Sequence, residues 1–257
     1  MAITDKKTGV WGLDQTYNKI NQGSIWNFYG QVGLWRSGTN ASGGLGLNQA
    51  PGVLNSYSSP VQLPGATWSR DLGKFALTPP TRYAYFAIKT DGTFYSWGQN
   101  TDGNLGLNDK THRSSPTQIP GTTWKTVSAA YEMHSAVKTD GTLWTWGNNT
   151  IGSLGHNKGG APHQGGQSYS SPKQVPGTTW AGGVMDEAAL FAKTDGTLWS
   201  WGYNQQGGLG INDTVKRSSP CQIPGTTWQG DPGKLAVSNG GNAMLAIKTD
   251  GTLWGWG

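Results

Sequence analysis

The stretch KTDGTLWTWGNN, from Lys138 to Asn149, decides the fold because the chain repeats it. Nearly the same letters begin at Lys89 (KTDGTFYSWGQN), at Lys193 (KTDGTLWSWGYN) and at Lys248 (KTDGTLWGWG). The Asp-Gly pairs stand 49, 55 and 55 residues apart. A second phrase, P-G-x-T-W, alternates with the first and ends at tryptophans spaced by 56, 56 and 48 residues. This period of about 50 residues indicates a repeat architecture.

Each unit predicts short antiparallel strands. Apolar and polar residues alternate on both sides of Asp-Gly, as in HSAVK and TLWTW, which predicts a hairpin with a type I′ turn and positive φ at both central residues. A polar loop follows and ends in Leu-Gly, whose leucine we expect in the core. The segments SSPTQIPG, SSPKQVPG and SSPCQIPG then predict an edge strand, because proline cannot donate to a central ladder.

Three or four such strands per unit predict an all-β fold, a β-propeller with blades of about 50 residues. Wide rings fill the wedges between twisted blades, so we expect Trp97, Trp146, Trp201 and Trp256 at equivalent buried positions. The predicted organisation is an N-terminal docking segment, 1–24, and a propeller, 25–257. The propeller divides into units 25–80, 81–128, 129–183 and 184–235 and a partial unit, 236–257.

Composition excludes several classes of protein. The chain has 257 residues, of which 41 are glycine, 14 are tryptophan and only 13% are charged, as expected for many strands and tight turns. The net charge of +5 is spread along the chain, so neither nucleic acid nor a membrane surface is an expected partner. Cys221 is the single cysteine, which excludes an intrachain disulfide, and we expect it to be a small half-buried side chain.

The segment from His134 to Gly155, HSAVKTDGTLWTWGNNTIGSLG, resembles the regulator of chromosome condensation repeat, and the resemblance extends over residues 25–257. It implies a propeller, and the founding members of that family have seven blades. This chain is too short for seven such units, so an incomplete ring is one expectation. The last unit ends at Gly257 without its loop and outer strand. Either the natural product continues, or another segment, such as KKTGVW near the N-terminus, completes the blade.

Residue types that carry chemistry occur mainly at repeated positions. Asp91, Asp140, Asp195 and Asp250 are interpreted as turn residues rather than as acids or metal ligands. The matching lysines, Lys89, Lys138, Lys193 and Lys248, form either a charged ring for an anionic partner or solvated strand ends, and we favour the second. The four histidines lack metal-ligand spacing, and no G-x-S-x-G phrase is present. We therefore predict no enzyme activity, no cofactor and no metal site.

Photoreceptors with this repeat carry a Gly-Trp-Arg-His-Thr phrase, of which this chain has only Trp35-Arg36, so photoreception is not expected. Two places interrupt the periodicity and are candidates for a function specific to this chain: the loop from His156 to Pro172, and the mutually similar segments SRDLGKFALTPPTRYAYF and QGDPGKLAVSNGGNAML, which are about seven residues longer than their partners. Such loops either recognise a ligand or pack against a neighbouring subunit, and we favour packing. The loop from His156 to Pro172 is seven residues longer than its counterparts. It offers His156, His163 and Tyr169 as a binding loop.

The segment 1–24 lies outside the repeat and offers the apolar side chains Trp11, Leu13, Tyr17 and Ile20 as an anchor. It is similar to the openings of phage virion proteins that carry this repeat. These observations favour a structural or adhesive propeller on a phage particle, such as a fibre, decoration or neck and tail protein, made in the host cytoplasm and present in multiple copies. Its expected partners are other virion proteins, bound through 1–24, and a host-surface glycan or protein. The alternative is a cytoplasmic interaction hub or a propeller similar to guanine-nucleotide exchange factors.

Overall fold

A computed structural model describes residues 33–49, 56–65, 67–71, 73–78, 83–157 and 168–257. Strands joined by turns make up this part of the chain, together with three short 3-10 helices, η1 (Ala41–Gly43), η2 (Pro232–Lys234) and η3 (Asn239–Gly241). No α-helix occurs in these ranges. The all-β prediction is confirmed.

Three complete blades, each a sheet of four antiparallel strands in sequence order, form the middle of the molecule. Their strands are β3 (Phe75–Leu77), β4 (Ala84–Ile88), β5 (Phe94–Gly98) and β6 (Arg113–Ile119); β7 (Trp124–Ala129), β8 (Met133–Lys138), β9 (Leu143–Gly147) and β10 (Tyr169–Gln174); and β11 (Trp180–Met185), β12 (Ala188–Lys193), β13 (Leu198–Gly202) and β14 (Arg217–Ile223). The S-S-P segments form β6, β10 and β14 at sheet edges, as predicted.

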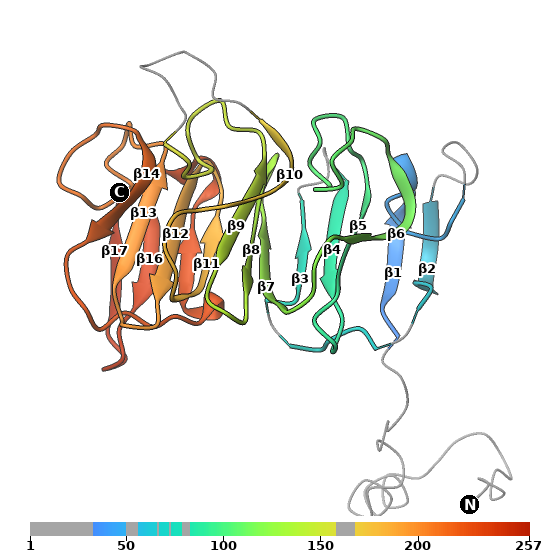
Figure 1. Ribbon diagram of the computed structural model, residues 1–257, viewed down its shortest axis with the longest axis horizontal. Coiled ribbons are helices and arrows are strands. Elements are labelled where there is room, and N and C mark those ends of the chain that lie inside the picture. Colours follow the sequence, from blue (N-terminus) through green and yellow to red (C-terminus); the bar gives the residue numbers. More distant parts are fainter. Residues whose placement is uncertain (1–32, 50–55, 66, 72, 79–82, 158–167) are drawn as a thin grey trace, which may run out of the picture.

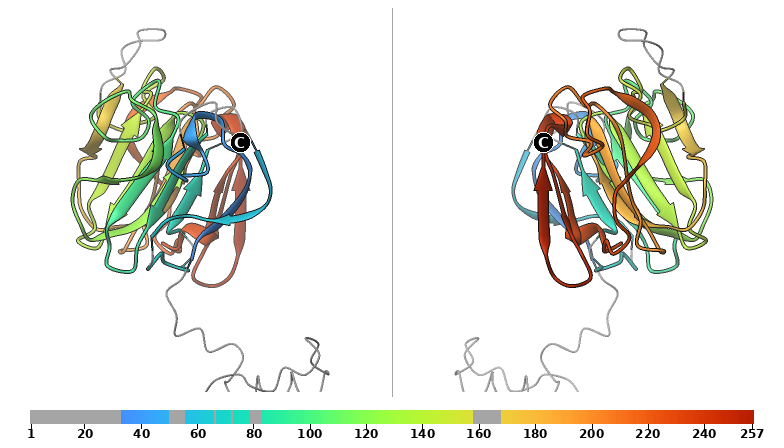
Figure 2. Two further views of the ribbon diagram at one scale, coloured as in Figure 1. Left: turned by 90° about the vertical axis from the view of Figure 1, so that its right-hand side faces the viewer. Right: turned by 90° about the vertical axis from the view of Figure 1, so that its left-hand side faces the viewer.

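Two smaller sheets flank the complete blades. The first pairs β1 (Trp35–Thr39) with β2 (Ser56–Gln62), and the last contains β15 (Leu235–Val237), β16 (Met244–Ile247) and β17 (Leu253–Trp256). The sheets stand side by side along an arc, with the β1–β2 sheet at one end and the β15–β17 sheet at the other (Figure 1). End-on views show that the described blades do not close into a ring (Figure 2). The predicted β-propeller with an incomplete ring is confirmed.

The predicted unit boundaries are shifted relative to the sheets. The boundaries at 128/129, 183/184 and 235/236 fall inside the first strand of a sheet, and the boundary at 80/81 falls between β3 and β4. The first strands of successive sheets contact one another, β3 with β7, β7 with β11 and β11 with β15. A repeat period leaves the origin of the unit open, so only the pairing of strands reveals which strand begins a blade.

The Asp-Gly hairpins differ from the predicted type I′ turns. At Asp91-Gly92 only the glycine has positive φ, 79°, and the same holds at the other three hairpins. The Gly92 amide donates to the Lys89 carbonyl (3.0 Å), and the Lys89 amide donates to the Thr93 carbonyl (2.9 Å). The type I′ prediction is wrong, because this pattern is a type I turn followed by a left-handed glycine in a bulge, an alternative hairpin with a longer loop.

The core lies between the blades. Four clusters of buried apolar side chains each join two successive sheets. Trp97, Trp146 and Trp201 are at most 1% exposed, which confirms their predicted positions. Trp256 occupies the equivalent register and also packs against the preceding sheet, but it is only half-buried.

The Leu-Gly loop of each sheet latches onto the next sheet. Leu45, Leu105, Leu154 and Leu209 are at most 1% exposed, as predicted. The indole Nε1 of Trp201 donates to the carbonyl of Ser153 (2.8 Å), the residue before Leu154, and the other three sheet boundaries repeat this bond. The glycine after the leucine is required, since a Cβ on Gly155 would lie 2.9 Å from that indole nitrogen.

The P-G-x-T-W phrase forms a second joint between neighbouring blades. The Trp124 amide donates to the Gly92 carbonyl in the preceding hairpin (3.0 Å), while the Thr123 carbonyl accepts from the Thr139 amide (2.9 Å) of its own blade. The two repeated phrases therefore bind each other across every boundary between complete blades. At the blade boundaries, the repeated phrases serve as joints.

Candidate interaction surfaces

The hairpin face of the arc presents the repeated lysines and aspartates. Each lysine is half-buried between two aromatic rings, with its Nζ 4.3 to 5.2 Å from the ring centroids. Lys138, for example, lies between Trp124 and Trp144. Lys138 and Lys193 end strands β8 and β12, as the favoured interpretation expects. The four lysines are half-buried rather than fully solvated, since a lysine over an aromatic face is held by the negative quadrupole of the ring.

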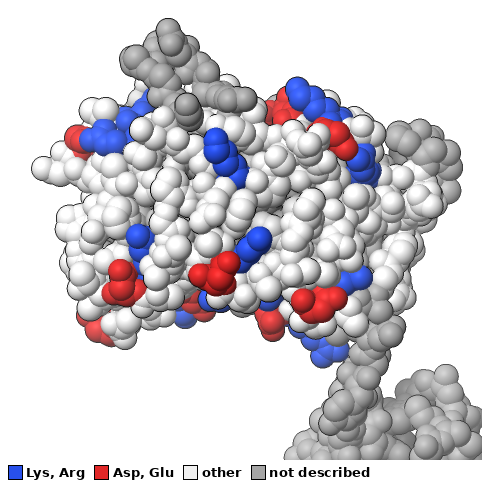
Figure 3. Space-filling model, in the orientation of Figure 1, with Lys and Arg blue, Asp and Glu red and all other residues white. Residues whose placement is uncertain are grey.

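The hairpin aspartates are exposed, and the carboxylate of each accepts hydrogen bonds within its own turn. Asp140 accepts from the hydroxyl (2.7 Å) and the amide (2.9 Å) of Thr142. These hydrogen bonds, that of the side chain first, lower the pKa of Asp140, and the same holds at Asp91, Asp195 and Asp250. An exposed carboxylate with a lowered pKa is poorly suited to donate a proton. Acidic and basic side chains lie in mixed groups on a mostly uncharged surface (Figure 3).

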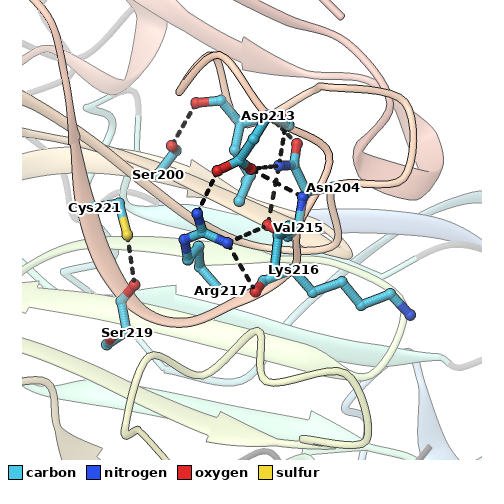
Figure 4. A network of polar contacts seen from close by, with 9 residues as sticks. Ser200, Asn204, Asp213, Val215, Lys216, Arg217, Ser219 and Cys221 are labelled. Atoms are coloured by element: carbon cyan, nitrogen blue, oxygen red, sulfur yellow. Dashed lines mark hydrogen bonds and ion pairs between the residues drawn. The ribbon is translucent and has the colours of Figure 1, made fainter. Parts of the chain in front are cut away.

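The opposite face carries polar networks that fix the Leu-Gly loops, and Figure 4 shows the one in the β11–β14 blade. The buried Asn204 accepts from the Leu209 amide (2.9 Å), and its Nδ2 donates to the carbonyls of Asp213 and Val215 (both 3.0 Å). Asp213 also forms an ion pair with Arg217. Asn100, Asp109 and Arg113 repeat the arrangement in the β3–β6 blade. Asn204, Asp213 and Arg217 are therefore all engaged in contacts that hold the loop.

The predicted binding loop is described only at its two ends. His156 and Tyr169 contact each other, with ring centroids 5.3 Å apart, and His156 Nε2 lies 2.9 Å from the Thr145 hydroxyl. Lys173 Nζ lies over the Tyr169 ring at 4.4 Å. Burial, and then Lys173, lowers the pKa of His156 to about 4. His163 lies outside the described residues, so the structure brings together two of the three predicted side chains, at the base of the insertion.

The predicted anchor residues Trp11, Leu13, Tyr17 and Ile20 also lie outside the described residues, as does the KKTGVW segment. Cys221 is half-buried, as expected. In the described ranges, no group of three His, Cys, Asp or Glu side chains is arranged to hold a metal ion. The part of the chain described contains no helix with the length and apolar character needed to cross a bilayer.

His134 is a feature that the sequence did not distinguish. Its ring is fully buried against Phe86 (centroids 4.7 Å apart) and Trp146, and neither ring nitrogen has a hydrogen-bond partner. Burial lowers its pKa to about 3. The strand register places Tyr85, Ala189 and Met244 at the same position of the other sheets. His134 is therefore a neutral packing residue.

A shallow depression of about 480 Å³ lies between the Lys193 hairpin and the segment from Trp228 to Asp231. Three of its polar side chains already have partners. Gln229 Nε2 donates to the Lys248 carbonyl (2.9 Å), Asp231 accepts from the Gly233 amide (2.9 Å), and Lys193 lies over two rings. The side chains named here are therefore held by contacts within the fold.

Comparisons with known proteins agree with this architecture. Residues 91–137 and 195–242 match the model of the Regulator of chromosome condensation (RCC1) repeat. Human WBSCR16 has a similar structure, with a TM-score of 0.65, 19% sequence identity and coverage of 88% of this chain and 60% of that chain. Yeast RCC1 (Prp20), solved bound to Kap60, gives a TM-score of 0.61 at 18% identity over 87% of this chain and 51% of that chain. The fold is an RCC1-like β-propeller.

The ultraviolet-B receptor UVR8 of Arabidopsis thaliana is 30% identical over 177 residues, which are 66% of this chain and 38% of the receptor. The chain thus spans between 38% and 60% of the length of these similar proteins. The chain is therefore similar to proteins that carry the RCC1 repeat, and its described blades form an RCC1-like propeller with an open arc.

Proposed function

We propose that this chain is a non-enzymatic interaction propeller, and more specifically a structural or adhesive module of a phage particle that attaches through residues 1–24. The observation that carries the first part is that the repeated polar and aromatic residues are used in joints and loop networks. Trp201, Asn204 and Lys193 each have an internal partner. A scaffold whose repeated residues all serve packing leaves loops and edges free for partners.

Similar proteins support protein partners as the ligand class. Prp20p of Saccharomyces cerevisiae is described with its binding properties to Gsp1p and histones, and with Kap60 bound. By analogy, this propeller binds other proteins, in the proposed setting the neighbouring virion proteins, and a host-surface protein or glycan through the insertion based on His156 and Tyr169. A cytoplasmic interaction hub or exchange-factor-like propeller is the alternative.

The particle role is supported by residues 1–24, which alone lack the repeat. A segment of this length outside a core does not offset its own ordering entropy, so it is suited to folding on a partner. Deletion of residues 1–24 should leave a folded β protein that no longer joins the particle. Incorporation is measured by immunoblotting of purified particles, and folding by circular dichroism.

A matched variant separates attachment from adhesion. Deletion of 158–167 should leave incorporation unchanged and reduce adsorption of the particle to its host. Normal incorporation of the protein that lacks 1–24 would remove the anchoring role. A full-length protein that is absent from particles and recovered with cellular proteins instead would favour the hub.

A further inference from the structure

The joints formed by the P-G-x-T-W phrases contain buried indole N–H groups without an acceptor. Trp68, Trp124, Trp180 and Trp228 end these phrases, and each is at most 4% exposed. In the described part of the chain, none of their Nε1 atoms has a hydrogen-bond partner. A buried donor without an acceptor is uncommon in folded proteins. Because the same unpaired donor recurs at four joints, its cause lies in the construction of the joint.

The glycine of the phrase shows where an acceptor would lie. A Cβ on Gly177 would be 3.8 Å from Trp180 Nε1 and 3.8 Å from Lys193 Nζ. Among the described residues, and apart from the two chain neighbours of the glycine, no other heavy atom lies within 4 Å of that point. Gly177 is exposed, so the point lies at the surface. An indole N–H and an ammonium group therefore converge on one small surface recess.

Two further joints repeat this convergence. A Cβ on Gly121 would lie 3.4 Å from Lys138 Nζ and 3.7 Å from Trp124 Nε1, and at Gly225 the corresponding distances are 3.9 and 3.2 Å. All three glycines have positive φ, between 96° and 107°. Side chains are disfavoured in this conformation, so the backbone itself keeps the recess free.

The first joint lacks the ammonium group. The three atoms nearest to a Cβ on Gly65 all belong to the ring of Trp68. Lys89 Nζ lies 5.2 Å from the centroid of that ring, farther than any other repeated lysine lies from its rings. The chain therefore contains an internal control, a joint with the unpaired indole but without the nearby cation.

We propose that the joints at Gly121, Gly177 and Gly225 each bind one small monovalent anion, chloride in ordinary salt solution, between the lysine Nζ and the indole Nε1. An anion accepts from both groups at once, and a hydrogen bond that involves charge is stronger than a neutral one. The recess has room for about one methyl group, which suits a single-atom anion better than a phosphate. The lysine stem is flexible, so a small outward shift of its ammonium group admits the anion to the indole.

A water molecule fits this recess less well. The indole and the ammonium group are donors only, so they offer no acceptor to the hydrogens of the water. The neighbouring hairpin carboxylate is already used in its turn, since Asp195 accepts from the amide (3.0 Å) and the hydroxyl (2.7 Å) of Thr197. The net charge of +5 also favours uptake of anions. This site does not depend on the particle role.

Crystals of the full 257-residue chain grown in sodium bromide locate the anion directly. Anomalous diffraction at the bromine edge should give a peak in contact with both nitrogens at Gly121, Gly177 and Gly225, and none at Gly65. Bromide peaks confined to other places would overturn the proposal. So would an equal peak at Gly65, because the ammonium group would then not be required.

A measurement in solution shows whether the sites bind chloride outside a crystal. Binding broadens the chloride NMR line, and bromide should displace this added width. Lys193→Gln should remove about a third of it, because one of three sites is lost. The matched variant Lys89→Gln should leave it unchanged, and circular dichroism checks that both variants are folded. Equal line widths for the two variants, or no added width with the unmodified protein, would contradict the proposal.

Discussion

Single residues of this propeller show where the repeat is strained. Thr67, Thr123 and Thr179, which precede the tryptophans of P-G-x-T-W, have φ between 66° and 68°. A β-branched side chain is rare in this left-handed region. Thr227 stands at the same place in the sequence and does not have positive φ. Neighbouring hydrogen bonds hold the strained conformation, since the Thr123 carbonyl accepts from Thr139 in the same blade.

Substitution Thr123→Gly should raise the free energy of unfolding by about 1 kcal/mol, because glycine adopts positive φ without a steric penalty. Thr227→Gly is the matched control and should be neutral or destabilising, since it only adds freedom to the unfolded chain. Urea denaturation measures both. An equal effect at the two positions would mean that the strain is not stored at Thr123.

The buried His134 leads us to expect that the stability of the protein depends on pH. Its folded pKa is about 3 against an ordinary 6.5, so below pH 6.5 the unfolded chain binds a proton that the folded chain does not. Stability should fall as the pH drops from 6.5 towards 3, by roughly 3 kcal/mol at pH 4 from this group. His134→Met, which copies Met244, should remove that loss. Comparing urea denaturation of both proteins at pH 7 and pH 4 isolates the effect, and identical pH dependence would show that the buried imidazole is not responsible.

At the scale of elements, the tryptophans fall into two sets with different polar roles. The Nε1 of Trp201 donates across a blade boundary to the Ser153 carbonyl, whereas the buried Nε1 of Trp180 in the same core cluster has no partner. Both rings are at most 2% exposed. A comparison of the two therefore separates the contribution of ring volume from that of the hydrogen bond.

Trp201→Phe should destabilise the protein by about 1 kcal/mol more than Trp180→Phe, because only the first substitution leaves a carbonyl unpaired. The loss of ring volume is common to both variants and cancels in the difference. Thermal and urea denaturation give the two values. A larger loss for Trp180→Phe would show that the blade boundary is held by packing alone.

The sequence predicted the elements far better than their details. Strand order, the outer S-S-P strands and the buried leucines of the Leu-Gly loops followed from period and turn chemistry, which are local. The turn type did not, because Asp-Gly is compatible with a type I turn and bulge as well as with type I′. The partial burial of the lysines was not predicted either, since the second ring over Lys138, that of Trp124, comes from a different phrase of the repeat.

In the candidate site, the sequence assigned His156 and Tyr169 to one loop but could not predict that they contact each other. The partner of each depends on Thr145 and Lys173, which lie on β9 and β10. The orphan nitrogens of His134 were invisible because the residue sits in an ordinary alternating pattern. The contact of His156 with Tyr169 and the burial of His134 both depend on residues that lie far apart in the sequence.

At the scale of the whole molecule, the middle sheets of the described arc have a described neighbour on both sides, and the two end sheets have one on a single side. Stability in such arrays is a sum of units and nearest-neighbour interfaces. Amide exchange should accordingly be slowest in β8 and β12 and faster in β16 and β17, with hours against minutes as the expected contrast. Mass spectrometry of peptic fragments measures it. Uniform protection across all sheets would indicate that the arc unfolds only as one unit.

The contact between the Leu-Gly loop and the tryptophan also gives the order of the sheets a direction. At each described boundary, the Leu-Gly loop of one sheet contacts the tryptophan of the next sheet. The first sheet has Ser37 where Trp97 stands in the next, so it contributes the loop around Leu45 but no equivalent indole. The joints of the described sheets therefore all run in one direction along the chain, from the Leu-Gly loop of one sheet to the tryptophan of the next.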